Sequence, residues 1–131
     1  MLALARIATG DVARAKRFFG ALAEILGAHL AVDRKGLVGF RGPEGALLLI
    51  GKPAQGAPGA GNGSQVSLLA PSRDAVDDAY RAALAMGGES VGEPGVRGDR
   101  LTGPYAAYFR DPYGHKIMVM HVAQLHAAAR L

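Results

Sequence analysis

The first half of the chain alternates short apolar segments with turns. Residues 2–8 form an apolar run of the length typical of a buried strand. Apolar side chains then recur at helical spacing from Val12 to Leu26, with Asp11 suited to begin this helix and Gly27 to end it. Strand-like segments follow at residues 29–32, 36–40 and 46–50, with turn sequences between them. The pattern predicts the element order βαβββ.

Residues 53–63 are rich in Gly, Pro and Ala and have no periodicity, which predicts a linker. The end of this stretch, Gly59-Ala60-Gly61-Asn62-Gly63, is similar to a glycine-rich phosphate loop. Such a loop opens a helix, whereas a strand-like segment follows here. The sequence therefore argues against a phosphate site.

The second half of the chain begins the same order again. Residues 65–69 predict a strand, and Pro71-Ser72 opens a helix that Gly87-Gly88 ends. A loop rich in Gly and Pro is expected at 92–104, strands at 105–109 and 116–122, and a short docked or fraying helix at 124–131.

Two regularities indicate that the second half is a copy of the first. Residues 40–45 (FRGPEG) match residues 109–114 (FRDPYG) at an offset of 69. The predicted helix starts, Asp11 and Ser72, differ by 61 residues, as do the predicted helix ends. Recurrence of helix, end and turn in one order favours duplication over a turn that happens to occur twice. We predict a single domain over residues 1–131, with repeat one at 1–52, the linker at 53–63, repeat two at 64–122 and a tail at 123–131.

Length and composition narrow the class of protein. The 131 residues include no Cys, which excludes disulfides, thiol catalysis and metal centres held by Cys. No uncharged apolar run approaches the roughly 18 residues that cross a bilayer, so no membrane association is expected. The first residues lack the basic-then-apolar order of a signal peptide, and a cytoplasmic location is therefore the expectation.

The net charge is +4, but its distribution does not indicate nucleic-acid binding. Basic residues occur singly or in pairs, and the densest group, Arg14, Lys16 and Arg17, lies on one predicted helix. Aromatic residues make up only 6% of the chain and do not alternate with basic ones as in proteins that stack bases. We expect no nucleic-acid partner.

The duplicated βαβββ plan resembles the vicinal oxygen chelate superfamily, which includes glyoxalase I, bleomycin-resistance proteins and extradiol dioxygenases. The most specific stretches are Gly10-Asp11 followed by Phe18-Phe19, then residues 61–66, and residues 82–112 with their Ala106-Ala107-Tyr108-Phe109-Arg110-Asp111-Pro112 end. The resemblance implies an α+β fold in which the two repeats form a curled mixed sheet, a half-barrel with the helices outside. It also implies a site on the concave face and a homodimer.

Catalytic members of this superfamily hold one divalent metal ion on the first and last strands of the repeats. The resemblance places these ligands at Gln65 and Met118 in repeat two, and the repeat offsets carry them to Leu4 and Leu49 in repeat one. Two apolar side chains, a thioether and a neutral amide cannot compensate a divalent ion for its lost water ligands. We therefore expect neither a metal ion nor any other cofactor.

The four His residues do not rebuild a metal site, because no two have the i, i+2 or i, i+4 spacing that would bring two imidazoles together. His121, near the end of the last strand, remains a candidate for the rim of the concave face.

The same positions suggest a small-molecule pocket. Leu4, Leu49, Met118 and Met120 are expected to form apolar walls, and Gln65 and Ser67 to offer polar contacts from one strand face, with core packing as the alternative for the apolar side chains. Arg97, in the lengthened loop, could attract an anionic ligand or simply be solvated. Tyr105 and Tyr108 point to opposite faces of one strand, and the resemblance favours Tyr105 as the cavity residue.

Three hypotheses follow for function. The first is a metal-independent pocket for a small apolar or aromatic compound. The second is a metal-free enzyme that uses acid–base groups such as Tyr105, His121 or Arg97. The third is a duplicated scaffold that dimerises and binds no ligand.

Overall fold

The computed structural model describes residues 1–123, so the expectation of a helix at 124–131 lies outside the described residues. Repeat one contains β1 (Leu4–Ala8), α1 (Val12–Leu26), β2 (His29–Arg34), β3 (Leu37–Arg41) and β4 (Leu47–Gly51). Repeat two contains β5 (Gln65–Leu69), α2 (Arg73–Ala85), β6 (Glu89–Val96), β7 (Tyr105–Arg110) and β8 (Lys116–His121). No helix of this part of the chain is both long and apolar enough to cross a membrane.

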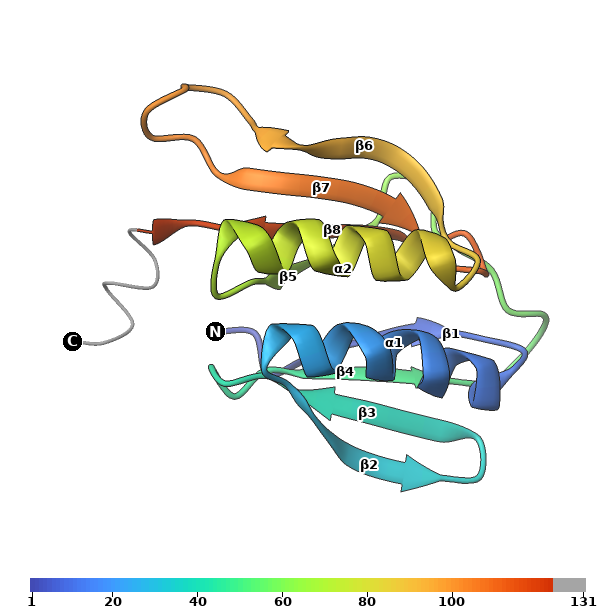
Figure 1. Ribbon diagram of the computed structural model, residues 1–131. Helices are drawn as coiled ribbons and strands as arrows, with labels where there is room; N and C mark the ends of the chain where they lie inside the picture. Colours follow the sequence, from blue (N-terminus) through green and yellow to red (C-terminus); the bar gives the residue numbers. More distant parts are fainter. Residues whose placement is uncertain (124–131) are drawn as a thin grey trace.

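The strands form two four-stranded mixed sheets, one for each repeat (Figure 1). Their orders are β1-β4-β3-β2 and β5-β8-β7-β6. The first and last strands of each repeat pair in parallel, and the other pairs are antiparallel. This arrangement confirms the α+β class and the two βαβββ repeats, and the sheets do not close into a barrel.

The helices begin where short polar side chains can accept hydrogen bonds from free backbone N–H groups. Asp11 accepts from the Arg14 N–H at 3.0 Å, and Ser72 accepts from the Ala75 N–H at 3.0 Å. Gly27 ends α1 with a φ of 77°, the left-handed conformation that favours glycine. These three predicted helix limits are therefore confirmed, whereas α2 ends at Ala85 with Met86 as its cap, just before the predicted Gly87-Gly88.

One strand was not expected. Strand β6 covers residues 92–96, which the sequence assigned to a loop because they contain Gly92, Pro94 and Gly95. The pairing of β6 with β7 shifts register between Ser90 and Gly92 and again between Gly92 and Gly95, so the irregular residues are accommodated at the edge of the sheet. The lengthened loop of repeat two is therefore shorter than expected.

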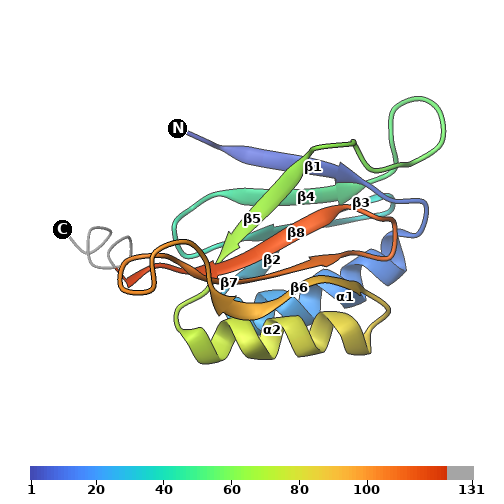
Figure 2. The ribbon, with the colours of Figure 1, turned by 90° about the horizontal axis from the view of Figure 1, so that it is seen from above.

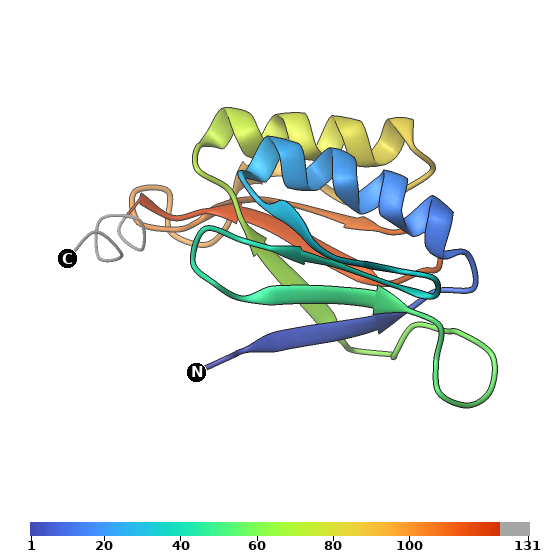
Figure 3. The ribbon, with the colours of Figure 1, turned by 90° about the horizontal axis from the view of Figure 1, so that it is seen from below.

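The main core lies between the helices and the sheets, and it is continuous across both repeats. The α1 and α2 helices lie side by side (Figure 1). Phe18 of α1 makes an edge contact with Phe109 of β7, with ring centroids 6.2 Å apart. Figures 2 and 3 show β1 and β5 on the side of the molecule remote from the helices. The helices and their aromatic side chains thus hold the two repeats together.

The turn before β8 makes a second link between the repeats. His115 is buried, and its Nε2 lies 2.7 Å from the carbonyl oxygen of Ala8, at the end of β1. The hydroxyl of Tyr113 lies so close to Gly10 that a Cβ there would be 2.7 Å away. Asp111, also buried, accepts from the backbone N–H groups of Tyr113 and His115 at 3.0 and 2.8 Å.

Burial raises the pKa of the Asp111 carboxyl, although the backbone donors and His115 act in the opposite direction. A raised pKa means that the folded state binds the proton more readily than the unfolded state. This group's contribution to stability is therefore present at low pH and is lost as the pH rises through the folded pKa.

We expect Asp111→Asn to raise the free energy of unfolding at pH 7, because the amide oxygen can still accept both hydrogen bonds while no charge is buried. The gain should shrink as the pH falls toward the unfolded pKa of about 3.9. Urea unfolding between pH 4 and pH 8 measures the effect. Asp78→Asn, on an exposed pair with Arg81, is the control and should change stability by no more than about 0.5 kcal/mol at any pH. A loss of stability for Asp111→Asn at pH 7 would contradict the argument.

Candidate functional site

The face of the second sheet opposite α2 carries four of the nine side chains that the sequence analysis selected. Strand alternation and register place Gln65, Ser67, Met118 and Met120 there, together with Tyr108. Met118 is buried but does not belong to the main core, which lies on the other side of the sheet. We call this surface, defined by these five residues, the open face.

A small cluster lies on the open face where the edge strand β5 meets β8. The Gln65 Nε2 donates to the Ser67 Oγ at 3.1 Å and lies 3.7 Å from the Met118 Sδ. The Ser67 Oγ lies 3.5 Å from the same sulfur. The structure therefore brings together three of the predicted site residues, as two polar groups around a polarisable thioether.

Two cations surround the aromatic ring of the open face. The Arg97 guanidinium lies 5.5 Å from the Tyr108 ring centroid, and the Lys116 ammonium lies 5.1 Å from it. Arg97 also donates to the carbonyl oxygen of Glu93. Arg97 thus reaches the open face from β6 and its following loop, and positive charge lies at the edge of the Gln65–Met118 cluster.

Tyr105 is not on the open face, so the expectation that it rather than Tyr108 lies there is wrong. Its ring packs against the main core, and its hydroxyl donates to the Asp77 carboxylate of α2 at 2.7 Å. This hydrogen bond to Asp77 and burial raise the pKa of Tyr105. The sequence fixes only that the two tyrosines point to opposite faces, and the choice between them depends on where α2 packs.

His121 lies on the same side of the sheet as Tyr105, with which it is paired in the β7–β8 register. Its Nδ1 lies 3.0 Å from the carbonyl oxygen of Ala70. The structure therefore places His121 away from the open face, contrary to the sequence expectation.

Leu4 and Leu49 belong to the first sheet, on the face opposite α1. Leu4 is 45% exposed, whereas Leu49 packs over Gly39, where a Cβ would lie only 2.7 Å from a Leu49 methyl group. No hydrogen bond or aromatic contact joins either leucine to the open face within residues 1–123. The four positions that the resemblance assigned to metal ligands are therefore split between two sheets.

These side chains do not fit a divalent metal ion. Leu4 and Leu49 offer no donor atom, Gln65 offers one neutral amide oxygen, and Met118 offers a thioether, which suits soft ions. Elsewhere in the described chain, no three His, Asp or Glu side chains lie close enough together to hold an ion.

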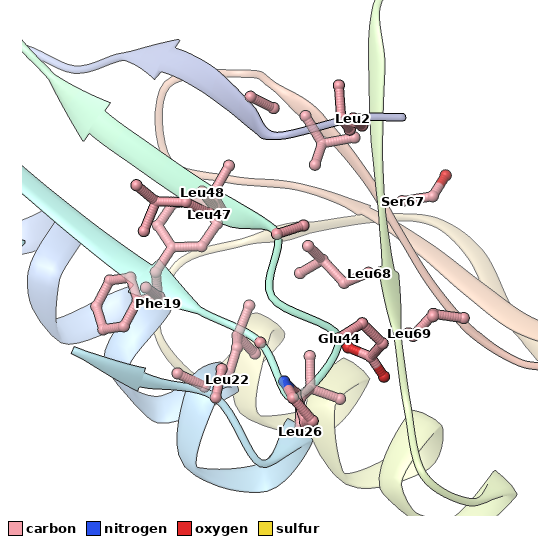
Figure 4. A pocket seen from close by; sticks show the side chains of 18 residues that line it. Leu2, Phe19, Leu22, Leu26, Glu44, Leu47, Leu48, Ser67, Leu68 and Leu69 are labelled. Atoms are coloured by element: carbon pink, nitrogen blue, oxygen red, sulfur yellow. The ribbon is translucent and has the colours of Figure 1, made fainter. Parts of the chain in front are cut away.

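A separate apolar cavity lies between the two repeats (Figure 4). Its volume is about 190 Å³, and its walls come from α1, β4, β5 and the turn that precedes β4. Phe19, Leu22, Leu48 and Leu68 are among the lining side chains, and Glu44 is the only ionisable one among the described residues. Sequence reasoning missed this cavity because its walls belong to different repeats and no local pattern shows how closely they meet.

Comparisons with known proteins agree with the geometry. The sequence profile described as Glyoxalase/Bleomycin resistance protein/Dioxygenase superfamily matches residues 2–119. A glyoxalase/bleomycin resistance protein from Albidiferax ferrireducens T118 is 32% identical, with a TM-score of 0.84 over 92% of this chain and 98% of that one. Comparison with curated proteins gives no match.

More distant structures share the fold. A glyoxalase-related enzyme from Fulvimarina pelagi has a TM-score of 0.72 at 15% identity, covering 92% of this chain and 87% of that one. A glyoxalase/bleomycin resistance protein/dioxygenase family enzyme from Burkholderia phytofirmans PsJN has a TM-score of 0.69 at 14% identity, covering 92% and 97%.

We expect the protein, purified without chelator, to retain far less than one divalent ion per chain in elemental analysis for Ni, Co, Zn, Mn and Fe. The double variant Gln65→His, Met118→Glu should gain Zn²⁺ or Ni²⁺ binding, because the ends of these two side chains already meet. Thermal shift with each metal measures the gain. The control is Ser64→His with Lys116→Glu, at the residue before β5 and at the first residue of β8. Retention of one ion per chain by the natural sequence would show that the donor argument is wrong.

Proposed function

The chain belongs to the Glyoxalase/Bleomycin resistance protein/Dioxygenase superfamily, and we propose that it is a metal-independent binding protein for a small apolar or aromatic ligand. The proposed ligand site is the open face of the second sheet. The observation that carries the proposal is the Gln65–Ser67–Met118 cluster, in which two paired, exposed polar groups lie against the buried Met118 beside Tyr108. A few fixed polar groups within an apolar surface are typical of small-molecule sites.

Tyr108 and the two cations beside it indicate which ligands would fit the open face. Tyr108 offers a face on which a flat apolar group can stack. Arg97 and Lys116 already lie against this ring, so a negatively charged substituent on an aromatic ligand would find a cation within reach. Gln65 and Ser67 can hydrogen-bond to a neutral polar substituent.

We propose that a second copy of the chain completes the site. Leu4 is 45% exposed on the first sheet, and Leu47 and Leu49 beside it are half-buried. Gln65 and Ser67 are exposed on the open face of the second sheet. A twofold-related partner would lay the apolar face of one sheet over the open face of the other and enclose a ligand between them, since Leu4 and Leu49 would then face Gln65 and Met118 across the interface.

The alternative of a metal-free enzyme has less support. Of its acid–base candidates, Tyr105 and His121 lie on the side of the sheet away from the open face. Arg97 reaches the open face, but a guanidinium does not give up its proton in proteins and is a poor group for proton transfer. If the protein is a scaffold that binds no ligand, no compound should raise its melting temperature.

We expect a thermal-shift screen of compounds with one or two aromatic rings to yield ligands that stabilise the protein. Tyr108→Ala should weaken such a ligand about five- to tenfold, the effect of losing about 1–1.4 kcal/mol of ring contact. Tyr105→Phe, on the opposite side of the same strand, is the matched control and should leave the affinity unchanged in isothermal titration. Equal weakening by both variants, or no ligand from the screen, would contradict the proposed site.

We expect the protein to have twice its chain mass of 13.5 kDa in light scattering. Leu4→Glu should shift it toward the monomer, because a charge would be buried in the proposed interface. Leu101→Glu is the control, since Leu101 is 95% exposed in the loop between β6 and β7. A natural chain that is monomeric at every concentration tested would overturn the proposed interface.

A further inference from the structure

We propose that the cavity between the repeats is a second binding site, separate from the open face, for a small amine with a single aromatic ring or an alkyl group of similar size. This inference does not depend on the proposed function. The only residue that the cavity shares with the open face is Ser67, and Figure 4 shows its hydroxyl turned away from the apolar walls.

Because the chain is duplicated, the cavity beside the turn before β4 can be compared with the equivalent place beside the turn before β8. The turns before β4 and β8 have the same backbone. Arg41 donates to the carbonyl oxygen of Gly45 at 2.7 Å, and Arg110 donates to that of Gly114 at 2.8 Å. Both glycines have positive φ values, 97° and 90°. Differences between the two places therefore come from side chains and not from the path of the chain.

In repeat two, those side chains fill the space beside the seam between the repeats. His115 extends to the Ala8 carbonyl, Tyr113 lies against Gly10, and the space left beside Asp111 is only about 10 Å³. Phe109 and Ile117, on the two strands that this turn connects, have no exposed surface.

In repeat one, the positions that match Asp111 and His115 at the offset of 69 are Gly42 and Ala46. Both line the cavity of about 190 Å³, and neither has a side chain that can reach across the seam. Leu48, which matches Ile117, is correspondingly only half-buried. The cavity exists because one copy of the turn has small residues where the other has a filled and hydrogen-bonded set.

The size of the cavity sets the size of the ligand. An engineered apolar cavity of about 150 Å³ lined by similar side chains binds benzene. A cavity of about 190 Å³ therefore has room for a single ring with a short substituent. The walls contributed by Phe19, Leu22 and Leu68 favour an apolar body for the ligand.

The negative charge at one end of the cavity favours a ligand with a positively charged substituent. In Figure 4, Glu44 lies between Leu26 and Leu69. It has no ion-pair or hydrogen-bond partner among residues 1–123. Leu26 and Ala28 flank the C-terminal end of α1, where the backbone carbonyls carry partial negative charge, and the last turn of α1 has no basic residue. A carboxylate and a helix C-terminus together favour a cation.

The test uses three probes of one shape, namely 2-phenylethylamine, 2-phenylethanol and phenylacetate, titrated by NMR chemical-shift perturbation. The Kd values are taken from the backbone amide signals of α1 and β4 at the cavity, because phenylacetate also fits the proposed site on the open face. At these signals the amine should bind most tightly and phenylacetate most weakly. Glu44 is exposed, so Glu44→Gln should raise the Kd of the amine about two- to fivefold, as expected for one exposed ion pair, and leave that of the alcohol within about 1.5-fold. Equal Kd values for the amine and the carboxylate, or no binding of any probe, would overturn the proposal.

Two variants test whether the probes occupy this cavity. Ala46→His places in repeat one the residue that closes the seam in repeat two, and it should weaken the amine and the alcohol at least tenfold. Ala5→Leu narrows the cavity from β1 and should act in the same direction. Ala54→His, in the exposed linker, is the control and should leave both Kd values unchanged. If Ala46→His and Ala54→His act equally, the probes bind elsewhere.

Other occupants of the cavity give different results. If residues 124–131 occupy it, the full chain will not bind the probes and a chain that ends at Ala123 will, which overturns the proposal. If a second copy occupies it, probe binding will weaken as protein concentration rises, with the same consequence. Tyr108→Ala should leave amine binding unchanged, so failure of the open-face site and failure of this one are distinguishable.

Discussion

The packing of α1 against α2, closed by the contact of Phe18 with Phe109, is the constraint on which the rest of the structure depends. Each repeat has about 50 to 60 residues, a size at which a separate core is only marginally stable, and each has one helix that covers only one face of its sheet. Joining the helices gives a continuous core. It also fixes which sheet faces are left for other uses, because the faces opposite the helices carry no helix of their own among the described residues.

Predictions that depend on local sequence were confirmed, whereas those that depend on how the helices pack on the sheets were not. Element order, helix ends and the duplication depend on local patterns, and Asp11, Ser72 and Gly27 act as their residue types predict. The predictions were wrong in two situations. In one, a residue type that is rare in strands lies in a strand; in the other, packing between distant elements decides which face of a strand is covered. Strand β6 was missed because Pro and Gly disfavour strands in general, although a sheet edge with register shifts accepts them. Tyr105 was assigned to the wrong side because alternation does not say which side α2 covers.

For the candidate site too, contacts within one repeat were predicted from the sequence and contacts between the repeats were not. Alternation placed Gln65 and Ser67 on one face of their strand, and the family resemblance paired Gln65 with Met118. The three side chains meet because they lie on adjacent strands of one repeat. The repeat offsets could not show that Leu4 and Leu49 would lie on a different sheet, since an offset describes equivalence and not proximity. The cavity between the repeats could not be predicted at all, because it depends on how side chains from both halves meet at the seam. Duplicated proteins thus keep a common backbone while their equivalent positions acquire different chemistry.

The outer strands β2 and β6 have a consequence for how the protein behaves at high concentration. Sheet edges with regular, free N–H and C=O groups can recruit strands from other molecules and start fibrous aggregates. Both outer edges here are irregular, with a shift at Leu30–Val32 in β2 and two shifts in β6, where Pro94 also lacks an N–H group. The residues that made β6 hard to predict from the sequence therefore disfavour pairing with other molecules along this edge, and a regular β6 would favour aggregation.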